Sequence, residues 1–144
     1  MNLETVFSIV SALALFSWIA LFIFYPSQIV YKVLFSGTLL LLSLTYLYFI
    51  ILGMGAESEG GFGTLAEVKA LLSSDEALLA GWIHYLAFDL FVGMWIAHDS
   101  WKLDINRWVL LPCLLLTFML GPVGLLTYFI LRGIKSHNII QSPH

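Results

Sequence analysis

The sequence predicts an all-α membrane protein: a bundle of four transmembrane helices with a short interfacial amphipathic helix between spans two and three. Hydrophobic residues make up 60% of the 144 residues and charged residues only 10%, whereas soluble domains carry about 25% charged residues. Four apolar segments, at about 5–25, 29–52, 77–97 and 108–131, approach or exceed the roughly 20 residues that a spanning helix needs. The whole chain, residues 1–144, is expected to form a single integral membrane domain.

The first segment is interpreted as a retained span and not as a cleaved signal peptide. Glu4 is the only charge before it, so a basic leading region is absent, and no small-residue cleavage site follows. Pro26 ends the segment in a tight turn. Because no Ser- and Arg-rich transit peptide is seen either, a multi-pass protein of a bacterial inner membrane or a thylakoid membrane is expected.

The second segment leads into the one long connection, 54–76, whose glycine-rich beginning cannot continue a regular helix. Thr64 and Glu67 then form a capping-box pattern, and apolar residues follow at helical spacing. This pattern predicts a short amphipathic helix at the membrane interface. The capping pattern recurs at 73–76, where it predicts the start of the third span.

Composition also limits the classes of function. The net charge of −3 argues against a nucleic-acid partner, so the lipid bilayer is the expected surrounding. The single cysteine, Cys113, cannot form an intrachain disulfide and is interpreted as a packing residue. No metal cluster, phosphate-binding loop or hydrolase nucleophile motif is found, so neither a cofactor nor a metal is expected.

Basic residues do not decide the orientation of a four-span chain. Such a chain would carry three basic residues on each side: Lys69, Arg132 and Lys135 on one, and Lys32, Lys102 and Arg107 on the other. Because the two sides are equal, the rule that basic residues stay on the cytoplasmic side gives no choice.

Asp89 lies near the middle of the third segment, and therefore near the bilayer midplane. A charged side chain there costs at least about 2.5–3.5 kcal/mol, which makes such residues functional candidates. Hydrocarbon favours the neutral carboxyl, which can donate a proton and then act as a base. A structural hydrogen bond between helices is the alternative interpretation.

The fourth segment offers Asp89 a partner. Pro122 has no N–H, so the carbonyl of Phe118 loses its helical donor. The Gly121-Pro122 pair also predicts a kink at this point. Asp89 is expected to donate to the freed carbonyl or to Thr117, which would make either a packing device or a polar pocket.

His84 is the second candidate for chemistry, but it precedes Asp89 by five residues. On an ideal helix this spacing separates them by about 140° around the axis and about 7.5 Å along it. The face of Asp89 carries Trp82 and Tyr85, and the face of His84 carries Phe88 and Phe91. Both groups could therefore act on one substrate only if it lay against two faces; a packed histidine is the alternative.

Two histidines on the third segment raise the question of haem. His84 and His98 have the spacing used when one helix holds two haems. The second ligands would have to come from another helix, whereas His137 and His144 lie in a polar tail. Haem is therefore not expected.

Two strings resemble signatures of the abscisic-acid-deficient-four-like family, the plant neoxanthin-synthase type that also has bacterial and algal relatives. They occupy 81–93 (GWIHYLAFDLFVG) and 116–126 (LTFMLGPVGLL), and the Gly-Gly-Phe-Gly loop at 60–63 fits as well. The resemblance covers roughly 50–132. One departure is His98-Asp99, where Arg-Asp would be expected.

The resemblance implies a membrane protein of xanthophyll metabolism. Neoxanthin forms from violaxanthin when an epoxide opens and a proton leaves the adjacent polyene carbon, which gives an allene without redox change. This chemistry implies an acid and a base, for which Asp89 and His84 are the candidates, and no cofactor. The expected substrate-binding residues are Trp82, Tyr85, Phe88, Phe91, Thr117, Gly121 and Pro122.

Three functions stay open at this point. The first is a cofactor-free isomerase of carotenoid epoxides, or a subunit of one. The second is a non-catalytic carotenoid-binding protein or assembly partner of a carotenoid enzyme. The third is a small proton-linked transporter that uses Asp89. A carotenoid ligand and a homo-oligomer or an enzyme partner are the corresponding partners.

Overall fold

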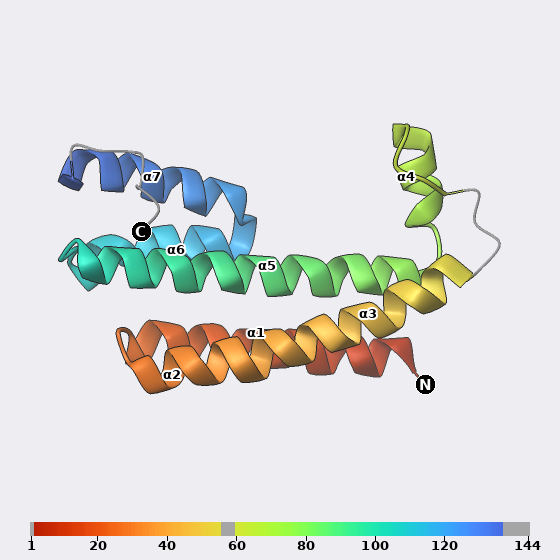
Figure 1. Cartoon of the computed structure of the whole chain (residues 1–144), viewed down its shortest axis with the longest axis horizontal. Helices are drawn as coiled ribbons and strands as arrows, with labels where there is room; N and C mark the ends of the chain where they lie inside the picture. Colours follow the sequence, from red (N-terminus) through yellow and green to blue (C-terminus); the bar gives the residue numbers. More distant parts are fainter. Residues whose placement is uncertain (1, 56–59, 137–144) are drawn as a thin grey trace.

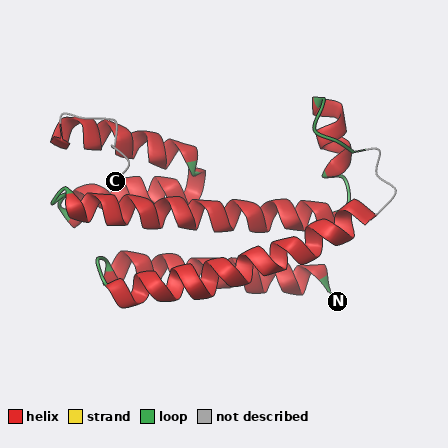
Figure 2. Ribbon diagram, viewed as in Figure 1, coloured by secondary structure: helices red, strands yellow, loops and turns green. Residues whose placement is uncertain are grey.

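The computed structural model describes residues 2–55 and 60–136, and every regular element within them is a helix (Figures 1 and 2). The predicted all-α class is therefore confirmed for this part of the chain. Three helical rods are long and apolar enough to cross a membrane: Leu3–Phe24, Gln28–Gly53 and Asp75–Lys102. They lie side by side along the length of the molecule (Figure 1).

The first two rods form a helical hairpin. Helix α1 (Leu3–Phe24) is capped by Asn2, whose side chain accepts a hydrogen bond from the Glu4 backbone N–H at 3.0 Å. After the turn at Tyr25-Pro26, three elements continue as one rod: α2 (Gln28–Val33), the π-helix η1 (Leu34–Leu39) and α3 (Leu40–Gly55). The Ser17 and Thr38 hydroxyls join α1 to η1 at 3.0 Å, which gives both buried groups a partner.

The predicted short helix after the glycine-rich segment is present as α4 (Leu65–Leu71). Thr64 caps it as expected, with its hydroxyl accepting from the Glu67 N–H at 3.2 Å. The Glu67 carboxylate in turn accepts from the Gly63 N–H at 3.0 Å. Figure 1 shows α4 lying crosswise to the long helices at one end of the molecule, the direction of a helix that lies along a membrane surface.

Helix α5 (Asp75–Lys102) is the centre of the fold and packs against α1, α3, α6 and α7. Ser74 caps its first turn by accepting from the Ala77 N–H at 3.2 Å. At Gly93 a side chain would overlap the Trp18 indole, so this glycine permits the close approach of α1. Asp89 stands halfway along α5, about 20 Å from either end at the helical rise.

The prediction of a fourth span over 108–131 is not confirmed. This region forms two helices, α6 (Arg107–Leu120) and α7 (Pro122–Ser136), separated at Gly121 by a backbone φ of +32°. Helix α7 turns back and runs alongside α6, so the expected kink is a reversal of the chain (Figure 1). With 14 residues, α6 is about 21 Å long. The α6–α7 hairpin therefore reaches only about half the depth of α5.

Two glycines allow the hairpin to close. Gly121 takes the positive φ that other residues rarely adopt. Gly124 lies against the Thr117 backbone, where a Cβ would overlap the Thr117 nitrogen and Cα. Non-helical backbone at membrane depth is tolerated only where protein groups satisfy it. The closed end of the hairpin is therefore expected to be surrounded by such groups.

The open end of the hairpin is tied to α1. The Arg107 Nη2 donates to the carbonyl oxygens of Phe22 and Ile23, both at 3.1 Å, and to that of Tyr25 at 3.4 Å. These carbonyls belong to the end of α1, where helical donors are missing and a cation is favourable. The contact fixes where α6 enters the bundle.

Candidate functional site

The structure places Asp89 against the closed end of the hairpin. The side chain is only 8% exposed, and its Oδ2 has no hydrogen-bond partner in the described part of the chain. A Cβ on Gly121 would lie 3.0 Å from Asp89 Cγ and 3.1 Å from Oδ2, and would overlap Oδ1. The absence of a side chain at Gly121 therefore makes the room that the carboxyl occupies.

The carbonyl groups at the hairpin turn that lack a helical donor receive a hydrogen bond from Tyr85. The expectation that Asp89 would donate to them is therefore corrected. The Tyr85 hydroxyl donates to the carbonyl oxygens of Met119 at 2.9 Å and Phe118 at 3.5 Å. The Thr117 hydroxyl donates to the Cys113 carbonyl within α6 at 2.8 Å. Tyr85 lies one turn before Asp89 and has the longer reach. The Asp89 carboxyl is thereby left available beside the turn.

Trp82 completes this side of α5. Its Nε1 donates to the Ser11 hydroxyl of α1 at 3.0 Å, and its ring centroid lies 5.4 Å from that of Tyr85. Five residues of α5 and the hairpin turn are grouped as the tip site: Trp82, Tyr85, Asp89, Gly121 and Pro122. All five are among the predicted site residues.

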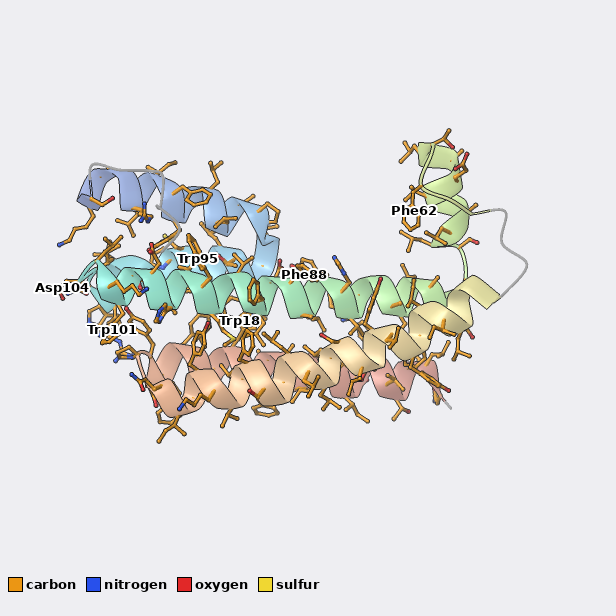
Figure 3. The ribbon with its side chains drawn as sticks, viewed as in Figure 1. Trp18, Phe62, Phe88, Trp95, Trp101 and Asp104 are labelled. Atoms are coloured by element: carbon orange, nitrogen blue, oxygen red, sulfur yellow. The ribbon has the colours of Figure 1, made fainter. Side chains whose placement is uncertain are left out.

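The remaining predicted residues of α5 lie on a different face. His84 stacks on Phe88 with ring centroids 4.3 Å apart and is tilted against Tyr46 of α3 at 5.7 Å. Phe91 lies near Phe35 of η1 at 6.4 Å. Figure 3 shows Phe88 just past the end of the hairpin. The structure thus does not bring His84 and Asp89 together.

Sequence reasoning missed a buried polar cluster on the hairpin side of α5. Asp99 Oδ2 accepts from Arg132 Nε at 2.8 Å and from the Tyr128 hydroxyl at 2.6 Å, and all three side chains are buried. Nearby, Trp95 lies between α5 and α7 and packs edge-on against Tyr128 (Figure 3). The opposite charges of Asp99 and Arg132 were a usable signal, but a four-span chain would place them on opposite sides of the membrane.

A cavity of about 240 Å³ lies between α1, α2 and α5, away from Asp89. His98 lines it, with its ring centroid 5.7 Å from Tyr31 and 6.3 Å from Trp101. The Tyr25 hydroxyl at its edge shares a hydrogen bond with Ser100 at 2.9 Å, and burial raises the pKa of Tyr25. His98 is therefore an aromatic-packed histidine at the end of α5.

Within residues 2–55 and 60–136, no three His, Cys, Asp or Glu side chains gather where they could hold a metal ion. His137 and His144, the remaining histidines weighed as haem ligands, lie outside the described residues.

Replacing Gly121 by Ala is expected to destabilise the protein by about 1–3 kcal/mol, because the new Cβ overlaps the Asp89 carboxyl and the φ is unfavourable. Thermal unfolding in detergent measures the effect. Gly37→Ala is the matched control, since a Cβ there has nothing within 4 Å. Equal melting temperatures for the two variants would contradict the packing of Asp89 against the turn.

A family model described as ABA DEFICIENT 4-like (ABA4-like) matches residues 5–128, which include the whole tip site. No curated protein and no solved structure matches the chain.

Proposed function

The chain belongs to the ABA DEFICIENT 4-like family, and on that premise we propose that it isomerises a carotenoid epoxide at the tip site. At family level it is a carotenoid-related, neoxanthin-synthase-like membrane protein. The observation that supports catalysis is the environment of Asp89. Its carboxyl is buried at mid-depth, has one oxygen without a partner, and lies against Gly121, where the hairpin turn carries no side chain. A buried polar atom without a partner is uncommon and calls for an explanation, of which a catalytic role is one.

The proposed reaction needs only one acid–base group. The neutral Asp89 carboxyl donates its proton to the epoxide oxygen, the carbon–oxygen bond next to the polyene breaks, and a hydroxyl and a polyene cation result. The Asp89 carboxylate then removes the proton from the adjacent polyene carbon, and the electrons of that C–H bond form the allene. Because an isomerisation neither gains nor loses protons, the neutral carboxyl is restored.

His84 takes a different place in this proposal from the base expected earlier. The epoxide oxygen and the departing proton sit on neighbouring atoms of the substrate, whereas His84 and Asp89 lie on separate faces of α5. We therefore assign His84, with Phe88, to contact with the polyene. Tyr85 is a positioning residue, because its hydroxyl donates to the Met119 carbonyl at 2.9 Å and fixes the hairpin turn beside Asp89.

Access from the bilayer supports a lipid-soluble substrate. Met119 at the hairpin turn is 63% exposed and Trp82 is 38% exposed, so the border of the tip site faces the surrounding lipid. A carotenoid dissolved in hydrocarbon could reach Asp89 sideways without passing through water. The aromatic rings of Trp82 and Tyr85 would pack on its ring end.

A non-catalytic carotenoid-binding role is the second candidate. The observation that favours it is an aromatic face of α5 on which Phe88 and Phe91 are exposed, with Phe91 near Phe35 of η1. This face could hold a polyene without any reaction.

Expression in a bacterium that makes epoxidised xanthophylls separates the two functions. Pigments are analysed by chromatography from whole cells and from the purified protein. A new allenic pigment supports the isomerase. An unchanged epoxide that copurifies in stoichiometric amount supports binding alone. Absence of both a new pigment and a bound one would contradict both proposals.

A further inference from the structure

The reversal of the chain at Gly121 changes the distribution of charge along the molecule. Helix α7 returns Arg132 and Lys135 to the end of the molecule where α5 finishes, as the contact of Arg132 with Asp99 shows. Five of the six basic residues consequently belong to one end, called the basic end: Lys32, Lys102, Arg107, Arg132 and Lys135. The three-to-three division of basic residues that a four-span chain would have is therefore replaced by a division of five to one.

The opposite end of the molecule has the opposite charge. Lys69 of α4 is its basic residue, and four acidic residues accompany it in the described chain: Glu4, Glu67, Asp75 and Glu76. Acidic residues in the first turns of α1, α4 and α5 suit the helix dipoles. Charge is therefore distributed unequally along the axis of the long helices.

We propose that the basic end lies on the cytoplasmic side of the membrane, against the anionic headgroups of that leaflet. The turn 25–28, the loop 103–106 and the end of α7 share this side, whereas Asn2 and α4 lie on the other. The occupant of the basic surface is the lipid headgroup layer. This inference does not depend on carotenoid chemistry, since it rests on the path of α7 and on charge alone.

The size of the asymmetry is sufficient to set orientation. Arg132 is neutralised by its ion pair with Asp99 and counts little. Lys32, Lys102, Arg107 and Lys135 are exposed, against Lys69 at the other end. Basic residues near an anionic leaflet are attracted to it, and basic residues close to the spans determine topology. Trp101 and Trp108 are exposed at the same end, as interfacial aromatic residues are.

Cysteine labelling tests both the orientation and the hairpin. Single cysteines are introduced as Gln28→Cys and Ser73→Cys, and a third is appended after His144; Cys113 is buried and remains as an internal control. In intact bacterial cells a membrane-impermeant maleimide should label only the Ser73→Cys protein. The other two should react only after the inner membrane is permeabilised.

Each other pattern overturns part of the proposal. If the appended cysteine and the one at 28 label from opposite sides, α6 and α7 form a span and the hairpin is wrong. If both label in intact cells, the hairpin stands but the cytoplasmic assignment is wrong.

Charge variants test the cause. Changing Lys32, Lys102 and Lys135 together to Gln should give a mixed orientation. In intact cells the appended cysteine should then be labelled on a fraction of the protein molecules. Lys69→Gln is the control and should leave the pattern unchanged. In reconstituted vesicles, adding phosphatidylglycerol to phosphatidylcholine should raise the melting temperature of the original protein more than that of the triple variant. Equal behaviour of the triple variant and the original protein in both assays would exclude the anionic leaflet as the partner.

Discussion

Replacing Asp89 by Asn is expected to abolish formation of the allenic pigment while the protein still folds and inserts. The amide has nearly the shape of a neutral carboxyl, so the fit against Gly121 is kept. It has no acidic proton for the epoxide oxygen and no basic form to accept one. General acid–base catalysis typically contributes about 10²–10⁴-fold, so a loss of that order is expected in pigment conversion per amount of protein.

His84→Gln is the matched control, because it changes a titratable residue of the same helix on the other face. It should retain conversion to within several-fold and alter mainly the amount of pigment that copurifies. Size-exclusion chromatography establishes that both variants are folded. Full conversion by Asp89→Asn would reduce Asp89 to a structural residue. Equal losses in both variants would restore a two-residue mechanism.

Replacing Asp99 by Ala is expected to have the largest effect on stability. Arg132 and the Tyr128 hydroxyl are both buried and both donate to Asp99 Oδ2. Removing one partner of a buried ion pair costs about 3–5 kcal/mol, because an uncompensated charge stays behind. Thermal unfolding in detergent should therefore show a strongly lowered midpoint, with α7 the first element to become protease-sensitive.

The double variant Asp99→Ala with Arg132→Met distinguishes the ion pair from simple loss of packing. Removing both charges should recover a large part of the lost stability, because replacing a buried pair by apolar groups is often neutral. If the double variant is no more stable than Asp99→Ala alone, the charge of Arg132 is not the cause. The hairpin would then be held mainly by packing around Tyr128.

Local signals predicted the long helices well. Apolar length identified the rods that contain α1, α3 and α5, and the caps at Thr64 and Ser74 marked two helix starts. Such features are read from neighbouring residues. The π-helix at Leu34–Leu39 had no comparable sequence signal.

Hydropathy predicted a single span over 108–131 because it measures the length of an apolar segment and not the path that the chain takes. Residues 108–131 are long and apolar enough for one helix, and Pro122 alone would only bend it. The reversal needs the positive φ at Gly121, the close contact of Gly124 with Thr117, and Tyr85 as a donor from another helix. The first two depend on the fold of the hairpin, and the third on tertiary structure.

The candidate site was predictable only where its signal lies within one segment of the sequence. A carboxyl in the middle of an apolar segment is conspicuous by itself, which identified Asp89. Partnerships between segments are not visible in this way. The role of Tyr85 toward the hairpin and the pairing of Asp99 with Arg132 both followed only from the path of the chain.

The hairpin also has an electrical consequence for the interior of the membrane. A helix that stopped at mid-depth would leave about half an elementary charge in hydrocarbon, negative at its carboxyl end. Here α6 ends and α7 begins around one residue, Gly121, so a half charge of each sign meets there and the two nearly cancel at a distance. At the range of the Asp89 carboxyl they do not cancel. A small shift of either helix would therefore change the local field and tune how readily that group releases its proton.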